Sequence, residues 1–266
     1  MDGIAQFKEV QKQSWVHFTP FEAITTPAAA KLVKHAAIAP GMRVLDVGCG
    51  TGVVAITAAR LGAVVTALDL TPQLLERAKE NACLAQVQIE FHEGDAESLP
   101  FPDGHFDTVL SQFGHMFAPR PEVAIAEMFR VLKPGGTIAF STWPPDALVG
   151  QTGALAARYA PPPAPGVVPP MLWGDSKVIE QRLGTWANKI RYERAAMLVP
   201  ALSLAQFRGN VERFAGPVIK LVEMLSASDP ARLESFRKEF DAIVAPYFED
   251  NIVRQEYLMT AARKAA

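Results

Sequence analysis

Three glycines at alternate positions, Gly48, Gly50 and Gly52, lie between two apolar segments of the chain. Residues 44–47 have the pattern of a buried strand and residues 53–61 that of a helix, so the glycines are expected to form the turn between them. Glycine allows a positive φ and a close approach of the backbone to a ligand, and the first turn of a helix presents unpaired N–H groups. The stretch therefore predicts a ligand-binding loop.

The spacing of the glycines narrows the class of ligand. In the dinucleotide-binding fingerprint G-x-G-x-x-G the third glycine comes one residue later, where this chain has Val53. Asp69 follows the next strand, near the roughly 20-residue offset at which a carboxylate binds ribose hydroxyls. A nucleoside is therefore expected, and an NAD(P)-dependent oxidoreductase stays an alternative. In isolation, Asp69 would equally suit a cap of the helix that begins near Pro72.

The chain from residue 42 alternates strand and helix patterns with short connections, which indicates a parallel sheet with helices on both faces. Ligands of such sheets bind outside the carboxyl ends of the strands. Four residues are expected at such ends: Gly48, Asp69, Asp95 and Ser111. The predicted strands are 42–47, 63–68, 87–91, 106–111 and 137–142, and the predicted helices between them are 52–61, 71–84 and 121–132.

Both flanks of this region are predicted to be mainly helical. Residues 1–40 should contain one or two helices, one of them starting at Thr26-Pro27 and ending at Pro40-Gly41. The remaining expectations concern the second half of the chain: an extended proline-rich loop at 160–170, a helix at 175–183, a strand at 189–198, helical apolar stripes at 207–225 and 233–247, a break at Gly216-Pro217, a helix start at Asp229-Pro230 and a final strand at 252–259.

Composition limits the partners. The chain has 266 residues, a formal net charge of −2 and its basic residues dispersed, so nucleic acid is not expected and a small molecule is favoured. The two cysteines are too few for a disulfide framework or a thiolate zinc site, and no metal is expected. With neither a signal peptide nor a membrane span in the pattern, we expect a cytoplasmic protein. The oligomeric state is left open.

Four motifs together resemble the class I S-adenosylmethionine-dependent methyltransferases, most closely the branch of ubiquinone and menaquinone C-methyltransferases. The resemblance covers roughly residues 40–145. The motifs are Val-Leu-Asp-Val-Gly-Cys-Gly-Thr-Gly at 44–52, Asp69, Gly-Asp-Ala-Glu-Ser-Leu-Pro-Phe at 94–101 and Leu-Lys-Pro-Gly-Gly at 132–136. The resemblance implies a Rossmann-like fold with a mostly parallel seven-stranded sheet, and S-adenosylmethionine as cofactor, with S-adenosylhomocysteine as product.

The same resemblance implies a role for each matched residue. Gly48 and Gly50 would contact the methionine moiety, and Asp69 would bind both ribose hydroxyls. Asp95 would accept the exocyclic amine of the adenine, against which Ala96 would lie. Ser111 would face the reacting methyl group. Two further residues complete the expected cofactor site: Asp46 and Leu70.

The acceptor has to be inferred from outside the cofactor motifs. Residues 111–114, Ser-Gln-Phe-Gly, lack the Asn/Asp-Pro-Pro-aromatic motif of nucleic-acid amino methyltransferases, a nucleophilic cysteine and a carboxylate cluster for a metal. Phe113, Met116, Phe117 and Trp143 suggest an apolar or aromatic acceptor, methylated at carbon or oxygen. Alternatives are a protein acceptor or a non-catalytic protein that binds the cofactor.

If the acceptor needs deprotonation, His115 is the best-placed candidate base, since it lies four residues beyond Ser111 and histidine titrates near neutrality.

The chain is expected to have three segments. The first is an N-terminal helical lid at 1–40, and the second is a cofactor-binding core at 41–145. Residues 146–266 belong to the same domain and add the proline-rich loop, the remaining strands and a helical substrate cap inserted before the last strand.

Overall fold

Apolar strands that alternate with helices produce a mostly parallel sheet, as predicted. The computed structural model describes residues 3–163 and 165–265. Its sheet has the strand order β3-β2-β1-β4-β5-β8-β6, with β1 to β5 parallel and β8 antiparallel to both neighbours. The strands are β1 (Arg43–Val47), β2 (Val64–Asp69), β3 (Ile89–Glu93), β4 (Phe106–Gln112), β5 (Leu132–Thr142), β6 (Ala187–Pro200), β7 (Phe248–Glu249) and β8 (Ile252–Lys264).

Eight strands replace the expected seven within the described residues. The additional strand, β7, has two residues and pairs only with β8. A strand this short has no alternating pattern, so the sequence does not reveal it.

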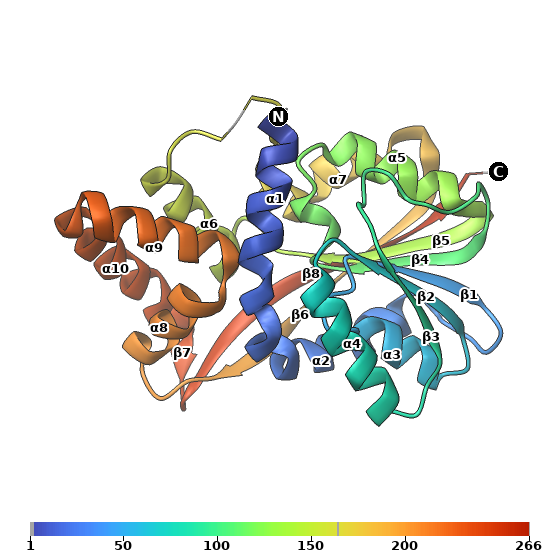
Figure 1. Ribbon diagram of the computed structural model, residues 1–266, viewed down its shortest axis with the longest axis horizontal. Coiled ribbons are helices and arrows are strands. Elements are labelled where there is room, and N and C mark those ends of the chain that lie inside the picture. Colours follow the sequence, from blue (N-terminus) through green and yellow to red (C-terminus); the bar gives the residue numbers. More distant parts are fainter. Residues whose placement is uncertain (1–2, 164, 266) are drawn as a thin grey trace.

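Helices cover both faces of the sheet (Figure 1). α5 and α7 lie on one face, and α2, α3 and α4 lie on the other. The α-helices are α1 (Gly3–Trp15), α2 (Glu22–His35), α3 (Val53–Arg60), α4 (Pro72–Leu84), α5 (Pro121–Val131), α6 (Leu148–Tyr159), α7 (Ser176–Leu183), α8 (Leu204–Phe214), α9 (Gly216–Ser228) and α10 (Pro230–Val244). The 3-10 turns are η1 (Val16–Phe21), η2 (His115–Phe117), η3 (Pro170–Gly174), η4 (Gly184–Trp186) and η5 (Ala245–Tyr247).

The predicted bounds of α2 are wrong. The helix begins at Glu22 because η1 leads directly into it, and Pro27 lies inside the helix. The Thr26 hydroxyl donates to the Glu22 carbonyl at 2.8 Å and does not cap a helix start. The helix ends at His35, before Pro40-Gly41. Two other local predictions are confirmed: Gly216-Pro217 separates α8 from α9, and the Asp229 side chain caps α10 by accepting from Arg232 N at 3.0 Å.

The sequence pattern does not reveal α6, because Gly150 and Gly153 interrupt it. Packing explains both glycines: a Cβ on Gly150 would lie 2.2 Å from the Pro144 carbonyl oxygen, and one on Gly153 would lie 2.9 Å from Met171 Cγ. The proline-rich segment at 160–169 has no helix or strand where it is described; Ala164 lies outside the described residues.

Two hydrophobic cores stabilise the molecule. One lies between the sheet and its flanking helices and includes Leu45, Leu110 and Phe140. The second lies among α6, α8, α9 and α10 and is centred on Phe236 and Phe240. The helices of the second core lie to one side of the sheet (Figure 1), and we call α6 and α8 to α10 the helical lobe. None of the helices in the described part of the chain is long and apolar enough to span a membrane.

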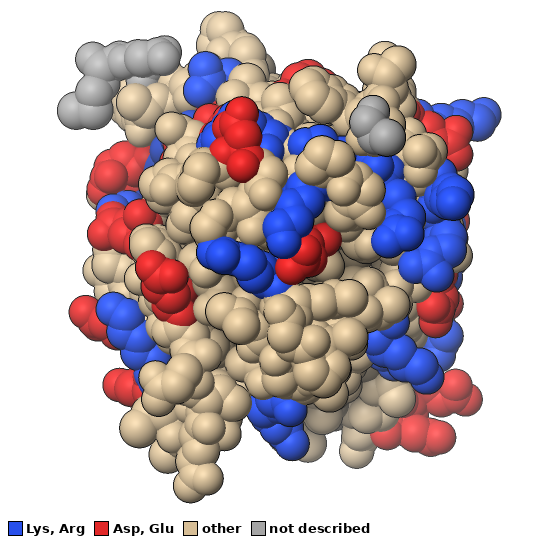
Figure 2. Space-filling model, turned by 90° about the vertical axis from the view of Figure 1, so that its right-hand side faces the viewer, with Lys and Arg blue, Asp and Glu red and all other residues tan. Residues whose placement is uncertain are grey.

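Charge is mixed on the face that holds the amino ends of the parallel strands. Figure 2 shows Lys and Arg side chains interspersed with Asp and Glu there. The amino-end loops carry ion pairs, including Lys133 Nζ to Asp107 Oδ1 at 2.6 Å and Arg130 Nη1 to Asp103 Oδ1 at 2.8 Å. The opposite edge of the sheet, at the carboxyl ends, holds the predicted site.

A close approach of two glycines positions the β1 and β4 loops at this edge. A Cβ on Gly114 would lie 2.6 Å from the Gly48 carbonyl oxygen and 2.8 Å from Gly48 Cα. Backbone atoms cannot yield as a flexible side chain can, so neither position accommodates a larger residue.

We therefore expect Gly114→Ala to lower the free energy of unfolding by roughly 1–3 kcal/mol, as overpacking does. Gly209→Ala is the matched control, because Gly209 lies inside α8 and an added Cβ would meet no other atom within 4 Å. It should be neutral or stabilise by roughly 0.5–1 kcal/mol, since alanine favours helix. Urea unfolding measures both, and equal stability of the two variants would contradict the steric explanation.

Candidate functional site

The glycine loop has the predicted turn. Gly48, Gly50 and Gly52 have φ values of +67°, +55° and +84°, a region that favours glycine. The amides of Gly48 and Cys49 both donate to the Leu68 carbonyl, at 2.8 and 3.0 Å. The loop after β1 is therefore tied to the end of β2.

Asp69 joins three loops at the carboxyl edge. Its Oδ2 accepts from Gly50 N at 2.8 Å, and its Oδ1 accepts from Thr71 N at 2.8 Å. Its backbone carbonyl accepts from Gly94 N at 3.0 Å. The Asp69 side chain thus orients the glycine loop and also accepts a backbone hydrogen bond at the start of α4. Burial raises the pKa of this carboxyl, while the two backbone hydrogen bonds oppose the rise.

Asp46 is a second buried carboxyl behind the glycine loop. It is 1% exposed, and its Oδ2 accepts from Ala55 N, in the first turn of α3, at 3.0 Å. Its Oδ1 has no hydrogen-bond partner among the residues described. Burial, with a smaller effect of the Asp69 charge, raises the pKa of Asp46 to about 7.

A small cavity lies against the glycine loop, with a volume of about 40 Å³. The glycine loop and the start of α3 form one side of it, and the N-terminal segment and the end of β4 form the other. Sequence reasoning missed Phe18, Thr25 and Gln112 as parts of this wall; only their position in the fold reveals them. The lining residues are Phe18, Thr25, Asp46, Gly48, Cys49, Gly50, Thr51, Val53, Val54, Gln112 and Phe113.

Ser111 and His115 lie in the interior beside this cavity and are not part of its lining. The Ser111 hydroxyl donates to the Val47 carbonyl at 2.6 Å and accepts from His115 N at 3.0 Å, so it fastens the end of β4 to β1. The His115 ring is 1% exposed and lies 4.6 Å from the Phe140 ring and 4.8 Å from the Trp173 ring, measured between centroids. Its role as a base stays a prediction.

The electrostatics of His115 follow from this burial. Neither ring nitrogen has a hydrogen-bond partner within residues 3–163 and 165–265. Burial, and then the positive charge of Arg182, lower the pKa of His115 to about 3. The imidazole is therefore neutral at physiological pH.

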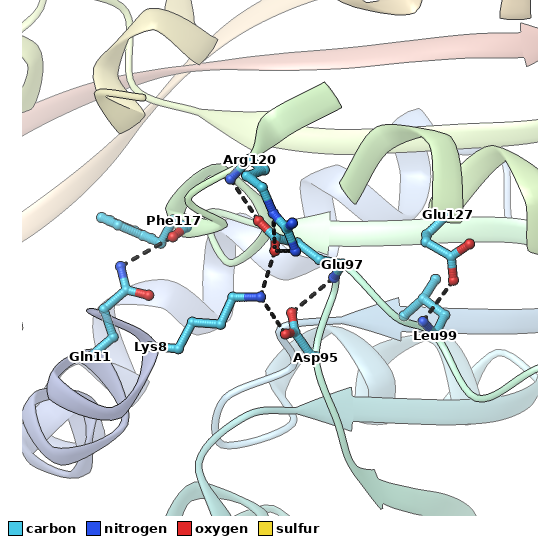
Figure 3. A network of polar contacts seen from close by, with 8 residues as sticks. All are labelled: Lys8, Gln11, Asp95, Glu97, Leu99, Phe117, Arg120 and Glu127. Carbon is cyan, nitrogen blue, oxygen red and sulfur yellow. Dashed lines mark hydrogen bonds and ion pairs between the residues drawn. The ribbon is translucent and has the colours of Figure 1, made fainter. Parts of the chain in front are cut away.

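Asp95 and Ala96 follow β3, on the loop next to Asp69. Asp95 Oδ1 accepts from Glu97 N at 2.9 Å, and Asp95 Oδ2 accepts from Lys8 Nζ at 2.5 Å (Figure 3). Glu97, which sequence reasoning did not single out, is the centre of this network. Its side chain is 1% exposed and binds both Lys8 and Arg120 (Figure 3).

The structure therefore brings most of the predicted residues to one edge. The glycine loop contains Gly48 and Gly50, and the side chains of Asp46 and Asp69 lie against it. The half-buried Leu70 follows Asp69. Asp95 and Ala96 lie on the adjoining loop. An orphan carboxylate oxygen on Asp46 and a loop of left-handed glycines fit a ligand that carries both hydrogen-bond donors and positive charge.

Comparisons with known proteins agree with this geometry. Residues 45–140 match the family model described as "Methyltransferase domain". An uncharacterized protein of Mycobacterium tuberculosis is 34% identical over 91% of this chain and 89% of its own length. Demethylmenaquinone methyltransferase of Deinococcus radiodurans is 40% identical over 50% of this chain and 54% of its own length.

A solved structure of a putative methyltransferase from Bacillus halodurans matches 90% of this chain and 99% of its own, with a TM-score of 0.60 and 22% identity. It supports the fold. Together the family match and the named relative identify residues 45–140 as the domain of an S-adenosylmethionine-dependent methyltransferase. S-adenosylmethionine is its cofactor, and the alternative of an NAD(P)-dependent oxidoreductase is set aside.

The buried Asp46 carboxyl predicts a pH dependence of stability. Its pKa rises from the ordinary 3.8 to about 7 on folding, so the folded protein binds the proton more tightly. The contribution of Asp46 to the free energy of unfolding is therefore fully present below about pH 4 and is lost as the pH rises through 7. We expect wild type to lose up to roughly 4 kcal/mol of unfolding free energy relative to Asp46→Asn between these limits.

Urea unfolding of both proteins at pH 4.5, 6 and 7.5 measures this difference. Asp107→Asn is the control with the opposite sign, because the Lys133 hydrogen bond lowers the pKa of Asp107. Relative to that variant, wild type should lose stability only as the pH falls toward and below 4. Parallel pH profiles of wild type and Asp46→Asn would contradict the proposed burial effect.

Proposed function

We propose that this methyltransferase transfers a methyl group to a small apolar or aromatic acceptor, at a carbon or an oxygen atom. The observation that carries the proposal is an aromatic cluster beside the glycine-loop cavity. The rings of Phe113 and Trp143 stack with centroids 4.0 Å apart and an interplanar angle of 6°. The Tyr257 ring meets Phe113 edge-on, with centroids 5.7 Å apart.

Phe113 belongs both to the aromatic cluster and to the lining of the cavity at the carboxyl edge of the sheet, which we call the cofactor edge. It lines the cavity and has a φ of +62°, which is unusual for a bulky side chain and is frequent at functional sites. The strand end thus directs an aromatic ring toward the cavity. Flat apolar groups pack favourably against such rings, which supports an aromatic or otherwise apolar acceptor.

The cofactor-holding residues are proposed as follows. Gly48 and Gly50 would leave room for the methionine moiety. Each Asp69 oxygen accepts one backbone hydrogen bond and can accept a second, so the carboxylate can also bind ribose hydroxyls. Asp95 would bind the adenine amine. The remaining proposed contacts are Asp46, Leu70, Ala96 and Ser111.

S-adenosylmethionine supplies the methyl group on an activated sulfonium. The residues of this chain then have to align the acceptor and exclude water. Phe113 lines the cavity, and the buried rings of Trp143 and Tyr257 pack against it, so that Phe113 would supply a supported apolar wall for this purpose. The helical lobe, of which α8 to α10 follow the proline-rich loop, is proposed to cover the acceptor as the substrate cap within 146–266. Residues 1–40 are proposed to form the lid.

The name of one relative is consistent with this substrate class, whereas that of another gives a protein-bound acid as acceptor. The Deinococcus radiodurans relative is named for demethylmenaquinone. A second, from Erwinia pyrifoliae, is a malonyl-[acyl-carrier protein] O-methyltransferase and is 40% identical over 42% of this chain. We propose the small-molecule class from the aromatic cluster, and the choice between carbon and oxygen is left to experiment.

Calorimetric titration with S-adenosylhomocysteine tests the cofactor site. Wild type should bind with micromolar affinity, and Asp69→Asn should lose roughly tenfold or more, because a charge-assisted hydrogen bond to the ligand is weakened and the glycine loop loses its anchor. Asp107→Asn is the matched control, since Asp107 also accepts a backbone N–H but lies at the opposite edge of the sheet. Failure of wild type to bind would overturn the site, as would equal losses in the two variants.

Incubation with isotopically labelled cofactor and a metabolite extract identifies the acceptor. Label in an apolar small molecule supports the proposal, and label only in protein would contradict it. With that acceptor, His115→Ala decides the role of the imidazole. A base would lower turnover by roughly 10²–10⁴ while cofactor affinity is unchanged. Near-normal turnover would remove His115 from the mechanism.

A further inference from the structure

One face of α1 binds the loops at the carboxyl edge of the sheet. Lys8, Gln11 and Lys12 are spaced so that they share this face. Gln11 Nε2 donates to the Phe117 carbonyl at 3.1 Å (Figure 3), and Lys12 Nζ lies 2.5 Å from Glu93 Oε1. Lys8 adds contacts to the loop after β3. The helix is thus held to three separate points of the sheet edge.

Lys8 makes the most buried of these contacts. Its Nζ lies 2.5 Å from Asp95 Oδ2 and 2.5 Å from Glu97 Oε2. The side chains of Lys8 and Glu97 are 15% and 1% exposed, whereas those of Lys12 and Glu93 are 29% and 52% exposed. Ion pairs removed from water are screened least and cost most to break on one side. Glu97 retains Arg120 as a partner if Lys8 leaves.

The other side of the N-terminal segment packs against the helical lobe. Ser14 lies against Gly216, where an added Cβ would be 3.1 Å from Ser14 Cβ. The rings of Phe21 and Phe214 lie 6.3 Å apart between centroids. α1 therefore runs between the helical lobe and the cofactor edge (Figure 1).

The cavity beneath this segment is too small for the cofactor. Its volume is about 40 Å³, whereas pockets that enclose molecules of this size measure roughly 300 Å³ or more. Phe18 of η1 and Thr25 of α2 form part of its wall. For the part of the cofactor that contacts the glycine loop to enter this cavity, the N-terminal segment would have to move.

We propose that α1 is a strap that Lys8 latches across the cofactor site, and that Lys8 and the cofactor compete for the carboxylate of Asp95. The inference rests on the proposed adenine contact of Asp95. The Lys8 ammonium and the adenine amine are both donors, and they approach the same acceptor. Lys8 is accordingly a positioning residue that sets the rate at which the cofactor binds.

Stopped-flow measurement of S-adenosylhomocysteine binding to Lys8→Met tests the latch. Methionine keeps much of the apolar length of lysine and removes the ammonium. Lys12→Met is the matched control, one turn away on the same face and paired with a carboxylate outside the proposed site. Because the cofactor then no longer has to displace an ammonium from Asp95, we expect Lys8→Met to raise the association rate constant by roughly tenfold and to lower the dissociation constant to match, the scale of one lost charged hydrogen bond. Lys12→Met should stay within about twofold of wild type.

Hydrogen exchange of the amides in 3–15 tests the same latch without any ligand. Exchange should be faster in Lys8→Met than in Lys12→Met, and Lys8→Arg should restore slow exchange. Unchanged rate constants together with equal exchange in the two methionine variants would overturn the latch. Absence of binding to wild type would instead overturn the proposed cofactor site, and the exchange comparison would still decide whether Lys8 holds the strap.

Discussion

The buried carboxylate of Asp69 is the constraint on which the cofactor edge depends. It accepts the amides of Gly50 and Thr71, so that one side chain fixes both the loop after β1 and the start of α4. Buried backbone N–H groups need such acceptors. The glycines alone would permit many turn conformations, since positive φ costs them little. Asp69 selects the conformation in which the loop opens toward the sheet edge, and the Gly48–Gly114 contact then sets how closely β4 can approach.

The N-terminal segment connects parts of the molecule that have separate hydrophobic cores. The sheet with its flanking helices forms one core, and the helical lobe forms the other. Between them, α1 is held by ion pairs and by the ring of Trp15, which lies 4.7 Å from the Phe117 ring between centroids; Ser14 is its one buried residue. Elements with few buried apolar contacts open at low free energy. The segment proposed to move when the cofactor binds is thus one whose helix has few fully buried apolar side chains.

Segments with a regular hydrophobic pattern, or with proline, glycine or a cap residue at their ends, could be predicted from the sequence. Contacts between distant segments could not. The strands, the helix start at Asp229 and the break at Gly216-Pro217 carry local signals. The proposed site residues Gly48, Asp69 and Asp95 were predicted from their places at strand ends. Lys8 and Glu97 carry no such signal, because 89 residues separate them in the chain. The start of α2 was missed for a local reason, since η1 continues into it and Pro27 imitates a first-turn proline.

The charge of the site explains why a loop so similar to a dinucleotide-binding turn suits a different ligand. Two acidic side chains, Asp46 and Asp69, are buried behind the glycines, and the Asp46 pKa of about 7 shows how unfavourable its ionised form is without a nearby cation. A pyrophosphate would add negative charge and increase that cost. A sulfonium and an ammonium would offset it, because each stabilises a nearby carboxylate. The acids behind the loop therefore add to the glycine spacing in favouring S-adenosylmethionine over an anionic nucleotide.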